Sequence, residues 1–183
     1  MDAGPLYWTS SESAIDVLLA EHQTILEVVD EIERECRRVE DGSALREPFW
    51  RDVLRFADEF DHGLHHQKEE QLLFPALERV GLSPDQGPTA VLRDEHRRIR
   101  FWRLRLEQTL VARDRTRLAA TAASYVDVLR THVMKENQIL FPLCRRLLDE
   151  ATLATLHREF RLLAADQRVH YWLSHPFELS AGA

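Results

Sequence analysis

The sequence predicts an all-α protein, an antiparallel up-down four-helix bundle with an additional C-terminal helix. Apolar residues recur with helical spacing, and no stretch alternates between apolar and polar residues as a strand does. Glycine and proline gather in short segments that separate long helical stretches. Four long helices joined by short connections favour the up-down arrangement, in which neighbouring helices run in opposite directions.

The first two helices are bounded by clear start and stop signals. The first is expected at about residues 14–40, because Ser13 is a good N-cap with Asp16 three residues later. Asp41-Gly42 ends it. The second helix is expected to open at Pro48, since proline is favoured in the first helical turn, and to run to about Val80.

The loop at residues 81–88 contains two glycines and two prolines and separates the halves of the bundle. A third helix is expected at about 89–112 and a fourth at about 114–148. A fifth, at about 150–173, would pack on the outside of the bundle or extend it. Aromatic residues near its end are expected either to cover one end of the bundle or to form a contact in a homodimer. We therefore treat residues 1–183 as one domain, with the bundle at about 14–148.

Composition excludes several classes of protein. Of 183 residues, 44% are hydrophobic and 30% are charged, which argues against disorder. The net charge of −7 makes nucleic acid a poor partner. No apolar run approaches the roughly 18 residues needed to span a membrane. Two cysteines are too few for a disulfide scaffold, and no secretory signal is visible, so a cytoplasmic protein is expected.

An internal repeat is the strongest signal in the chain. Residues 65–75 and 132–142 (132 − 65 = 67) carry the same residue at seven of eleven positions: His, Lys, Glu, Gln, Leu, Phe and Pro. A fainter repeat links Glu21-His22 with Glu95-His96 on the preceding helices. Each half is therefore a helical hairpin, with Glu-His on its first helix and HxxxE on its second.

The HxxxE spacing places histidine and glutamate on one side of a helix, because residues four apart lie one above the other. In a bundle the two pairs can face inward with the two remaining histidines opposite. Bundle cores use inward Glu and His to hold two metals, and such donors suit iron, manganese or zinc. Burying six polar groups without a cation would be costly. The predicted ligands are His22, His65, Glu69, His96, His132 and Glu136.

The second helix contains two overlapping HxxxE frames, His65/Glu69 and His66/Glu70. The repeat favours the first frame, because the counterparts of His66 and Glu70 are Val133 and Asn137, and neither matches. His66 and Glu70 are then expected to support the ligands or to lie on the surface.

Together these motifs resemble those of the hemerythrin-like family, the HHE cation-binding domains, over roughly residues 14–148. The resemblance implies a non-haem di-iron centre of two iron ions, often bridged by oxygen. Members of that family bind dioxygen, sense oxygen or iron, respond to nitric oxide, or repair iron–sulfur clusters, and some have peroxide-related activity. The expected partner is accordingly a small diatomic ligand (dioxygen or nitric oxide) or peroxide.

The sequence departs from the oxygen-carrying hemerythrins in two ways. Their fifth histidine, four residues from a histidine of the third helix, is missing, since Leu92 and Arg100 flank His96 at that spacing. His62 is a candidate substitute, and Tyr125 is a further candidate for the metal or its bound ligand. Asn137 also stands where those carriers place a bridging carboxylate, and Glu136 serves instead, as in the iron-centre repair proteins.

Four functions stay open at this point. The first is a carrier, sensor or store that binds dioxygen, nitric oxide or iron. The second is a di-iron oxidase or peroxidase-type enzyme, in which the metal supplies the redox chemistry. The third is iron–sulfur cluster repair, which is disfavoured because such proteins usually carry an N-terminal domain with cysteines. The fourth is an interaction module whose His and Glu residues form a buried polar network.

Overall fold

The computed structural model describes residues 13–165 and Trp172, and every regular element among them is helical. Segments of α-helix alternate with three π-helical segments, labelled η, in which each backbone hydrogen bond spans five residues. In chain order they are α1 (Ala14–Glu40), α2 (Glu47–Phe56), η1 (Ala57–His65), α3 (His66–Lys68), η2 (Glu69–Leu73), α4 (Phe74–Arg79), α5 (Pro88–Val111), α6 (Arg115–Lys135), η3 (Glu136–Leu140), α7 (Phe141–Leu147) and α8 (Glu150–Ala165).

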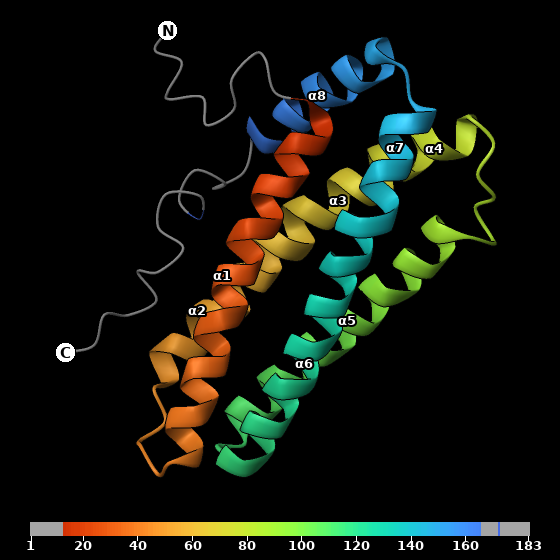
Figure 1. Ribbon diagram of the computed structural model, residues 1–183. Coiled ribbons are helices and arrows are strands. Elements are labelled where there is room, and N and C mark those ends of the chain that lie inside the picture. Colours follow the sequence, from red (N-terminus) through yellow and green to blue (C-terminus); the bar gives the residue numbers. More distant parts are fainter. Residues whose placement is uncertain (1–12, 166–171, 173–183) are drawn as a thin grey trace, which may run out of the picture.

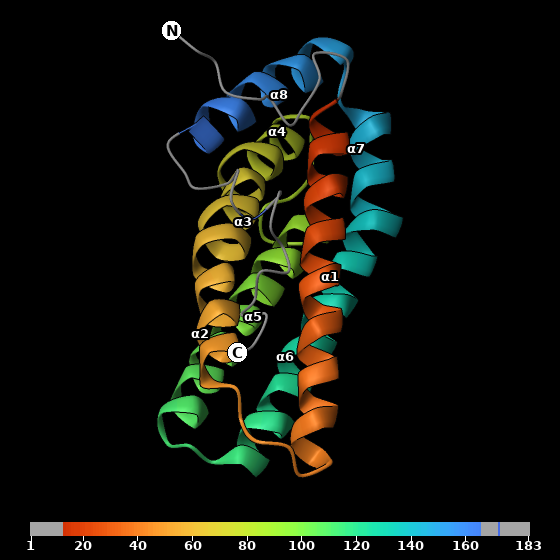
Figure 2. The same cartoon turned by 90° about the vertical axis from the view of Figure 1, so that its left-hand side faces the viewer.

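These segments form four long helical rods and one shorter helix. The rods are α1, the continuous run from α2 to α4, α5, and the continuous run from α6 to α7. The rods lie side by side, and the ribbon reverses direction between consecutive rods (Figures 1 and 2). Packing contacts join α1 to α6, α5 to α6, and α2 to α5. The prediction of an all-helical bundle is confirmed, and the ends of the first four predicted helices agree with the structure to within two residues.

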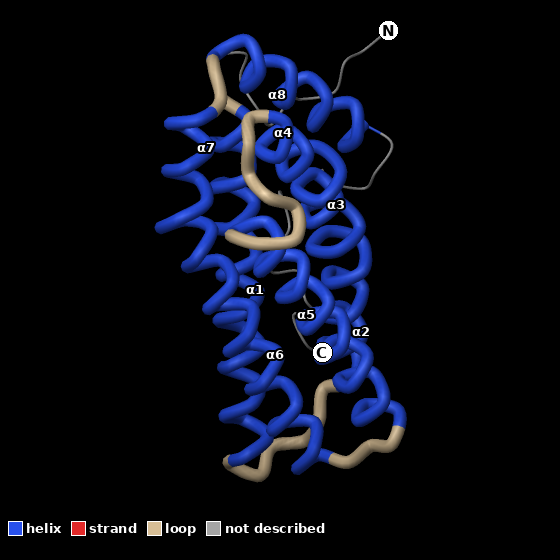
Figure 3. The backbone as a smooth tube through the Cα atoms, turned by 90° about the vertical axis from the view of Figure 1, so that its right-hand side faces the viewer, coloured by secondary structure: helices blue, strands red, loops and turns tan. Residues whose placement is uncertain are grey.

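The connections lie at the ends of the rods, and the longest of them joins α4 to α5 (Figure 3). Helix α8 crosses one end of the bundle, where it contacts α1 and η2 (Figure 2). The last part of the predicted C-terminal helix, beyond residue 165, lies outside the described residues except for Trp172. None of the described helices is long and apolar enough to cross a membrane.

One apolar core runs along the inside of the rods. Its largest members are aromatic side chains at most 2% exposed: Trp50, Phe60, Phe74, Phe141, Phe160 and Trp172. Midway along this core, the apolar lining is interrupted by fully buried histidine and glutamate side chains. Burying polar groups inside an apolar bundle costs free energy unless they are hydrogen-bonded or bind an ion. The contacts of these histidines and glutamates are therefore the key to the site.

The π-helical segments were not predicted from the sequence. Segments η2 and η3 begin at Glu69 and Glu136, which are equivalent positions of the repeat. Each is followed by a Phe-Pro pair, and a proline lacks an N–H and clashes with the carbonyl group four residues earlier. We attribute the widened turns to Pro75 and Pro142, which remove the ordinary hydrogen bond at that point. The Phe-Pro part of the repeat thus shapes the backbone at the two predicted glutamate ligands.

The start of α1 provides a direct test of the local sequence signals. Asp16 donates its backbone N–H to Ser13 Oγ at 3.2 Å, and Ser13 donates its N–H to Asp16 Oδ2 at 3.0 Å, which completes a capping box. We expect Ser13→Ala to lower the free energy of unfolding by about 1 kcal/mol, measured by urea denaturation. Ser124→Ala is the matched control, because Ser124 is half-buried within α6, donates only to the carbonyl of Ala120 and caps no helix end; an equal loss in both variants would contradict the capping role of Ser13.

Candidate metal centre

Four histidines from four different segments converge in the middle of the bundle. His22 on α1 faces His65 on η1, and their Nε2 atoms lie 3.0 Å apart. His96 on α5 faces His132 on α6, with 3.1 Å between the Nε2 atoms. We call these the first and second imidazole pairs. All four side chains are at most 1% exposed.

Each of the four rings presents its other nitrogen to an oxygen acceptor. Nδ1 of His22 lies 2.6 Å from Asn137 Oδ1, and Nδ1 of His65 lies 3.0 Å from Glu21 Oε2. In the second pair, the corresponding contacts of His96 and His132 are with Glu70 at 2.7 Å and Glu95 at 3.2 Å.

Because oxygen acceptors face all four Nδ1 atoms, we infer that these atoms carry the ring protons and that each Nε2 keeps its lone pair. Two lone pairs facing each other cannot form a hydrogen bond. For metal–nitrogen bonds of about 2.1 Å, two ligands at right angles lie about 3 Å apart. The Nε2 separation within each pair is therefore the one that a shared cation would give.

Two glutamates, Glu69 and Glu136, complete the cluster; we call them the central glutamates. Glu136 Oε2 lies 3.0 Å from His22 Nε2 and 3.3 Å from His132 Nε2, so it touches both imidazole pairs. Glu69 has one oxygen 3.5 Å from His65 Nε2 and the other 3.3 Å from His96 Nε2. Each carboxylate thus spans the two pairs, as a bridging ligand would.

The central glutamates are fully buried, and neither oxygen of either group accepts a well-formed hydrogen bond within the described part of the chain. Burial raises the pKa of Glu69 well above its usual value, and the nearby Glu136 carboxylate adds to this shift. Burial alone would also raise the pKa of Glu136, but in the metal-free protein the charge of protonated His132 and a hydrogen bond from His22 hold it below the usual range. Buried carboxylates are normally paired or bind metals, so this arrangement fits a cation.

A second layer of charged residues supports the imidazoles, and it follows the repeat. The Lys68 ammonium is fully buried and donates to Glu21, the acceptor of His65. Lys135 donates in the same way to Glu95, the acceptor of His132. Both lysines lie in the repeat, but no role was predicted for them. Their recurrence in both halves was the signal that could have revealed it.

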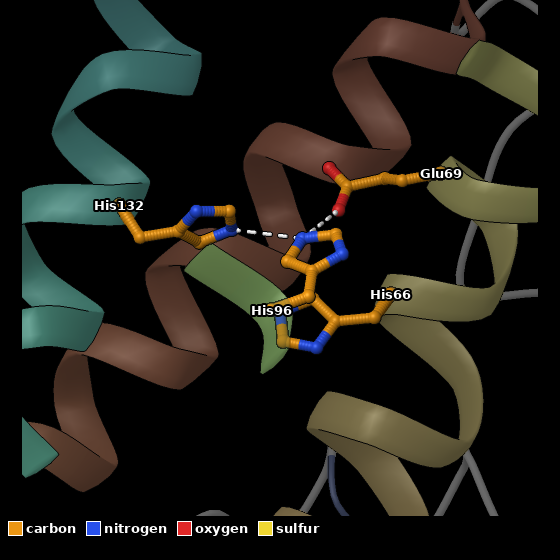
Figure 4. A group of neighbouring side chains, drawn as sticks. All are labelled: His66, Glu69, His96 and His132. Carbon is orange, nitrogen blue, oxygen red and sulfur yellow. Dashed lines mark hydrogen bonds and ion pairs between the residues drawn. The ribbon is translucent and has the colours of Figure 1, made fainter. Parts of the chain in front are cut away.

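The structure brings together all six predicted ligands and also places the four additional candidates. Glu70 is partly exposed and contacts the outer nitrogen of His96, so it supports a ligand from outside the cluster. His66 is 1% exposed, which contradicts a surface position. Its ring stacks on that of His96 with 3.8 Å between centroids, close to Glu69 and His132 (Figure 4). Comparison of the two halves of the repeat excluded His66 from the predicted ligands, because its counterpart, Val133, carries no polar group.

The other two candidates lie beside the cluster. His62 is partly buried and pairs with Asp61 at 3.2 Å, and no grouping of ligand-capable atoms joins it to the imidazole pairs. Tyr125 is 2% exposed, and burial together with the negative charge of Asp61 raises the pKa of its hydroxyl well above the usual value. The structure therefore associates both residues with Asp61.

Comparison with known proteins agrees with this geometry. The family profile described as the hemerythrin HHE cation-binding domain matches residues 13–144, which contain all six predicted ligands. The chain belongs to the hemerythrin HHE family. It is also 27% identical over 139 residues to uncharacterized proteins of Mycobacterium bovis and Mycobacterium tuberculosis. That match covers 73% of this chain and 54% of each relative, so the chain spans about half the length of those mycobacterial proteins.

The two lysines of the repeat offer a matched test of the supporting layer in this HHE domain. We expect Lys68→Met to lower the free energy of unfolding of the metal-free protein by about 3–5 kcal/mol, because it leaves Glu21 buried without its cation. The side chain of Lys135 is 36% exposed, so solvent screens its pair, and Lys135→Met should cost about 1 kcal/mol or less. Urea denaturation measures both free energies of unfolding. Equal losses would contradict the difference in burial between Lys68 and Lys135.

Proposed function

We propose that this HHE domain holds two iron ions, one at each imidazole pair, with the central glutamates bridging them. The observation that supports this most strongly is the combination of four Nε2 atoms directed inward and two buried carboxyl groups without well-formed hydrogen bonds. Neutral nitrogen and carboxylate donors without thiolate suit iron, and manganese or zinc would suit the same set. The residues are His22, His65, Glu69, His96, His132 and Glu136.

Iron held in this way would supply binding or reduction of a small oxidising ligand such as dioxygen, nitric oxide or peroxide. The six side chains would offer each ion two imidazole nitrogens and shared carboxylate oxygens, and the His66 ring also lies within reach of the second pair. With so few protein donors, each ion would be able to take a small ligand from solution. Because the ligand side chains are at most 1% exposed, a small ligand suits the site better than a bulky organic substrate.

The protein's own residues keep the centre ready for binding. The outer acceptors orient each ring and hold its proton on Nδ1, so that Nε2 stays free. The surrounding apolar side chains exclude bulk water, so water does not compete with a metal ion for the carboxylate oxygens. We therefore propose a carrier, sensor or store.

A di-iron oxidase or peroxidase-type enzyme is the second candidate. The small number of protein donors at each ion favours it, since an enzyme must admit and convert a ligand at the metal. Catalytic removal of peroxide by the iron-loaded protein would support the enzyme, whereas reversible binding without turnover would support the carrier or sensor.

Three isosteric substitutions test whether Glu69 and Glu136, and not Glu70, are the glutamate ligands. We expect Glu69→Gln and Glu136→Gln each to lose most of the bound iron, because each removes a charge that the ions share. Glu70→Gln should keep most of it, since Glu70 contacts only the outer nitrogen of His96 and Arg100. Iron per chain is measured by elemental analysis after reconstitution, and equal losses in all three variants would overturn the assignment.

Removal of the metal tests the proposal by a route independent of substitution. A cation bound only by the folded state must stabilise it, by about 2.7 kcal/mol when free metal is 100 times its dissociation constant. We therefore expect chelation to lower the melting temperature of the iron-loaded protein and iron to restore it. An unchanged melting temperature would favour a plain buried polar network.

A further inference from the structure

A third group of ligand-capable side chains adjoins the centre. Asp61 and His62 lie on η1, and His66 follows on the first turn of α3. Asp61 Oδ2 is 3.2 Å from His62 Nε2, and Asp61 Oδ1 is 3.3 Å from His66 Nε2. The carboxylate thus faces both imidazoles at once. Ligand-capable atoms of all three residues lie within 4.8 Å of one another.

Well-formed hydrogen bonds do not account for this arrangement, although the Tyr125 hydroxyl and the His62 ring both lie near enough to Asp61 to interact with it. Both oxygens of Asp61 and the Nε2 atoms of His62 and His66 are buried, and none has a hydrogen-bond partner of acceptable geometry among the described residues. Buried polar atoms are nearly always satisfied, so four such atoms facing one another need an explanation. Asp61 and His66 are at most 1% exposed, which makes the need stronger.

The charges and the position of the group favour a cation. Both ring nitrogens of His66 are buried without a hydrogen-bond partner among the described residues, and Nε2 is the one that faces Asp61. Burial would raise the pKa of Asp61, yet the neighbouring histidines keep it below its usual value, so the carboxylate is charged. A set of one carboxylate and two imidazoles suits divalent transition metals better than Mg²⁺ or Ca²⁺, because the latter two prefer oxygen ligands.

We propose that Asp61, His62 and His66 form a third cation site, which binds a divalent transition metal such as Fe²⁺. The side chain of His62 is 12% exposed, so this site opens toward solvent, whereas the imidazole pairs do not. His66 stacks on His96, which places the site directly beside the second imidazole pair. An ion bound here lies between solvent and the centre, where it would load the dinuclear site; this role rests on the proposed function above.

The test is a metal titration with Co²⁺ as the probe, followed by equilibrium dialysis and the absorbance of bound Co²⁺. The full chain should bind about three ions, whereas Asp61→Asn and His62→Gln should each bind about two. His62 lies at the edge of the site, so His62→Gln serves as the second variant if Asp61→Asn does not fold. Asp58→Asn is the matched control, because Asp58 lies on the same segment and pairs with Arg103 instead; it should bind about three.

The Glu69→Gln variant separates this proposal from the dinuclear one. It should keep the ion that Asp61→Asn removes and lose ions that Asp61→Asn keeps. If Asp61→Asn and His62→Gln bind as many ions as the unmodified chain, or if Asp61→Asn and Glu69→Gln remove the same ions, the third site is overturned. If the chain binds only the ion that Asp61→Asn removes, the third site stands and the dinuclear proposal fails.

Discussion

Two buried carboxylates that no well-formed hydrogen bond satisfies are the constraint on which the rest of the structure depends. The central glutamates lie beside each other inside an apolar bundle, which raises the pKa of Glu69, and a bound cation would neutralise them. The imidazole pairs can serve that cation only while their protons stay on the outer nitrogens. The outer acceptors enforce this, and Lys68 and Lys135 neutralise two of those acceptors in turn. The lysines thus offset the cost of burying the outer acceptors, and the outer acceptors orient the imidazoles that they contact.

The repeat arranges these layers nearly symmetrically, and the exceptions give the two halves different properties. Glu70 and Asn137 are equivalent positions, and each contacts the outer nitrogen of one imidazole, but only Glu70 is charged. His66 corresponds to Val133, so only one half carries the additional histidine that faces Asp61. The second imidazole pair thus has a polar neighbour that the first pair lacks.

Much of the fold could be predicted from the sequence, because caps, glycines and helical spacing are local signals. The ends of α1 and the convergence of the four histidines followed from these signals and the repeat. The π-helical turns of η2 and η3 could not be predicted, since they depend on how Pro75 and Pro142 shift the helical hydrogen bonds. No comparable proline follows η1.

The supporting residues were harder to assign from the sequence. Lys68 lies in a charged stretch typical of a solvated face, yet it is fully buried, because the fold places Glu21 opposite it. His66 was placed outside the ligands by a comparison with Val133, which assumes that both halves keep the same roles. Asp61 gave no signal at all, since a single aspartate in a helix is common. Its significance depends on contacts that only the folded chain creates.

The most direct test of the dinuclear centre is an anomalous difference map recorded at the iron absorption edge, from crystals of the iron-loaded protein. The account predicts one peak beside each imidazole pair, about 3.5–4 Å apart, with the central glutamates between them. A single peak, or iron bound elsewhere while the central glutamates are hydrogen-bonded to water, would contradict it.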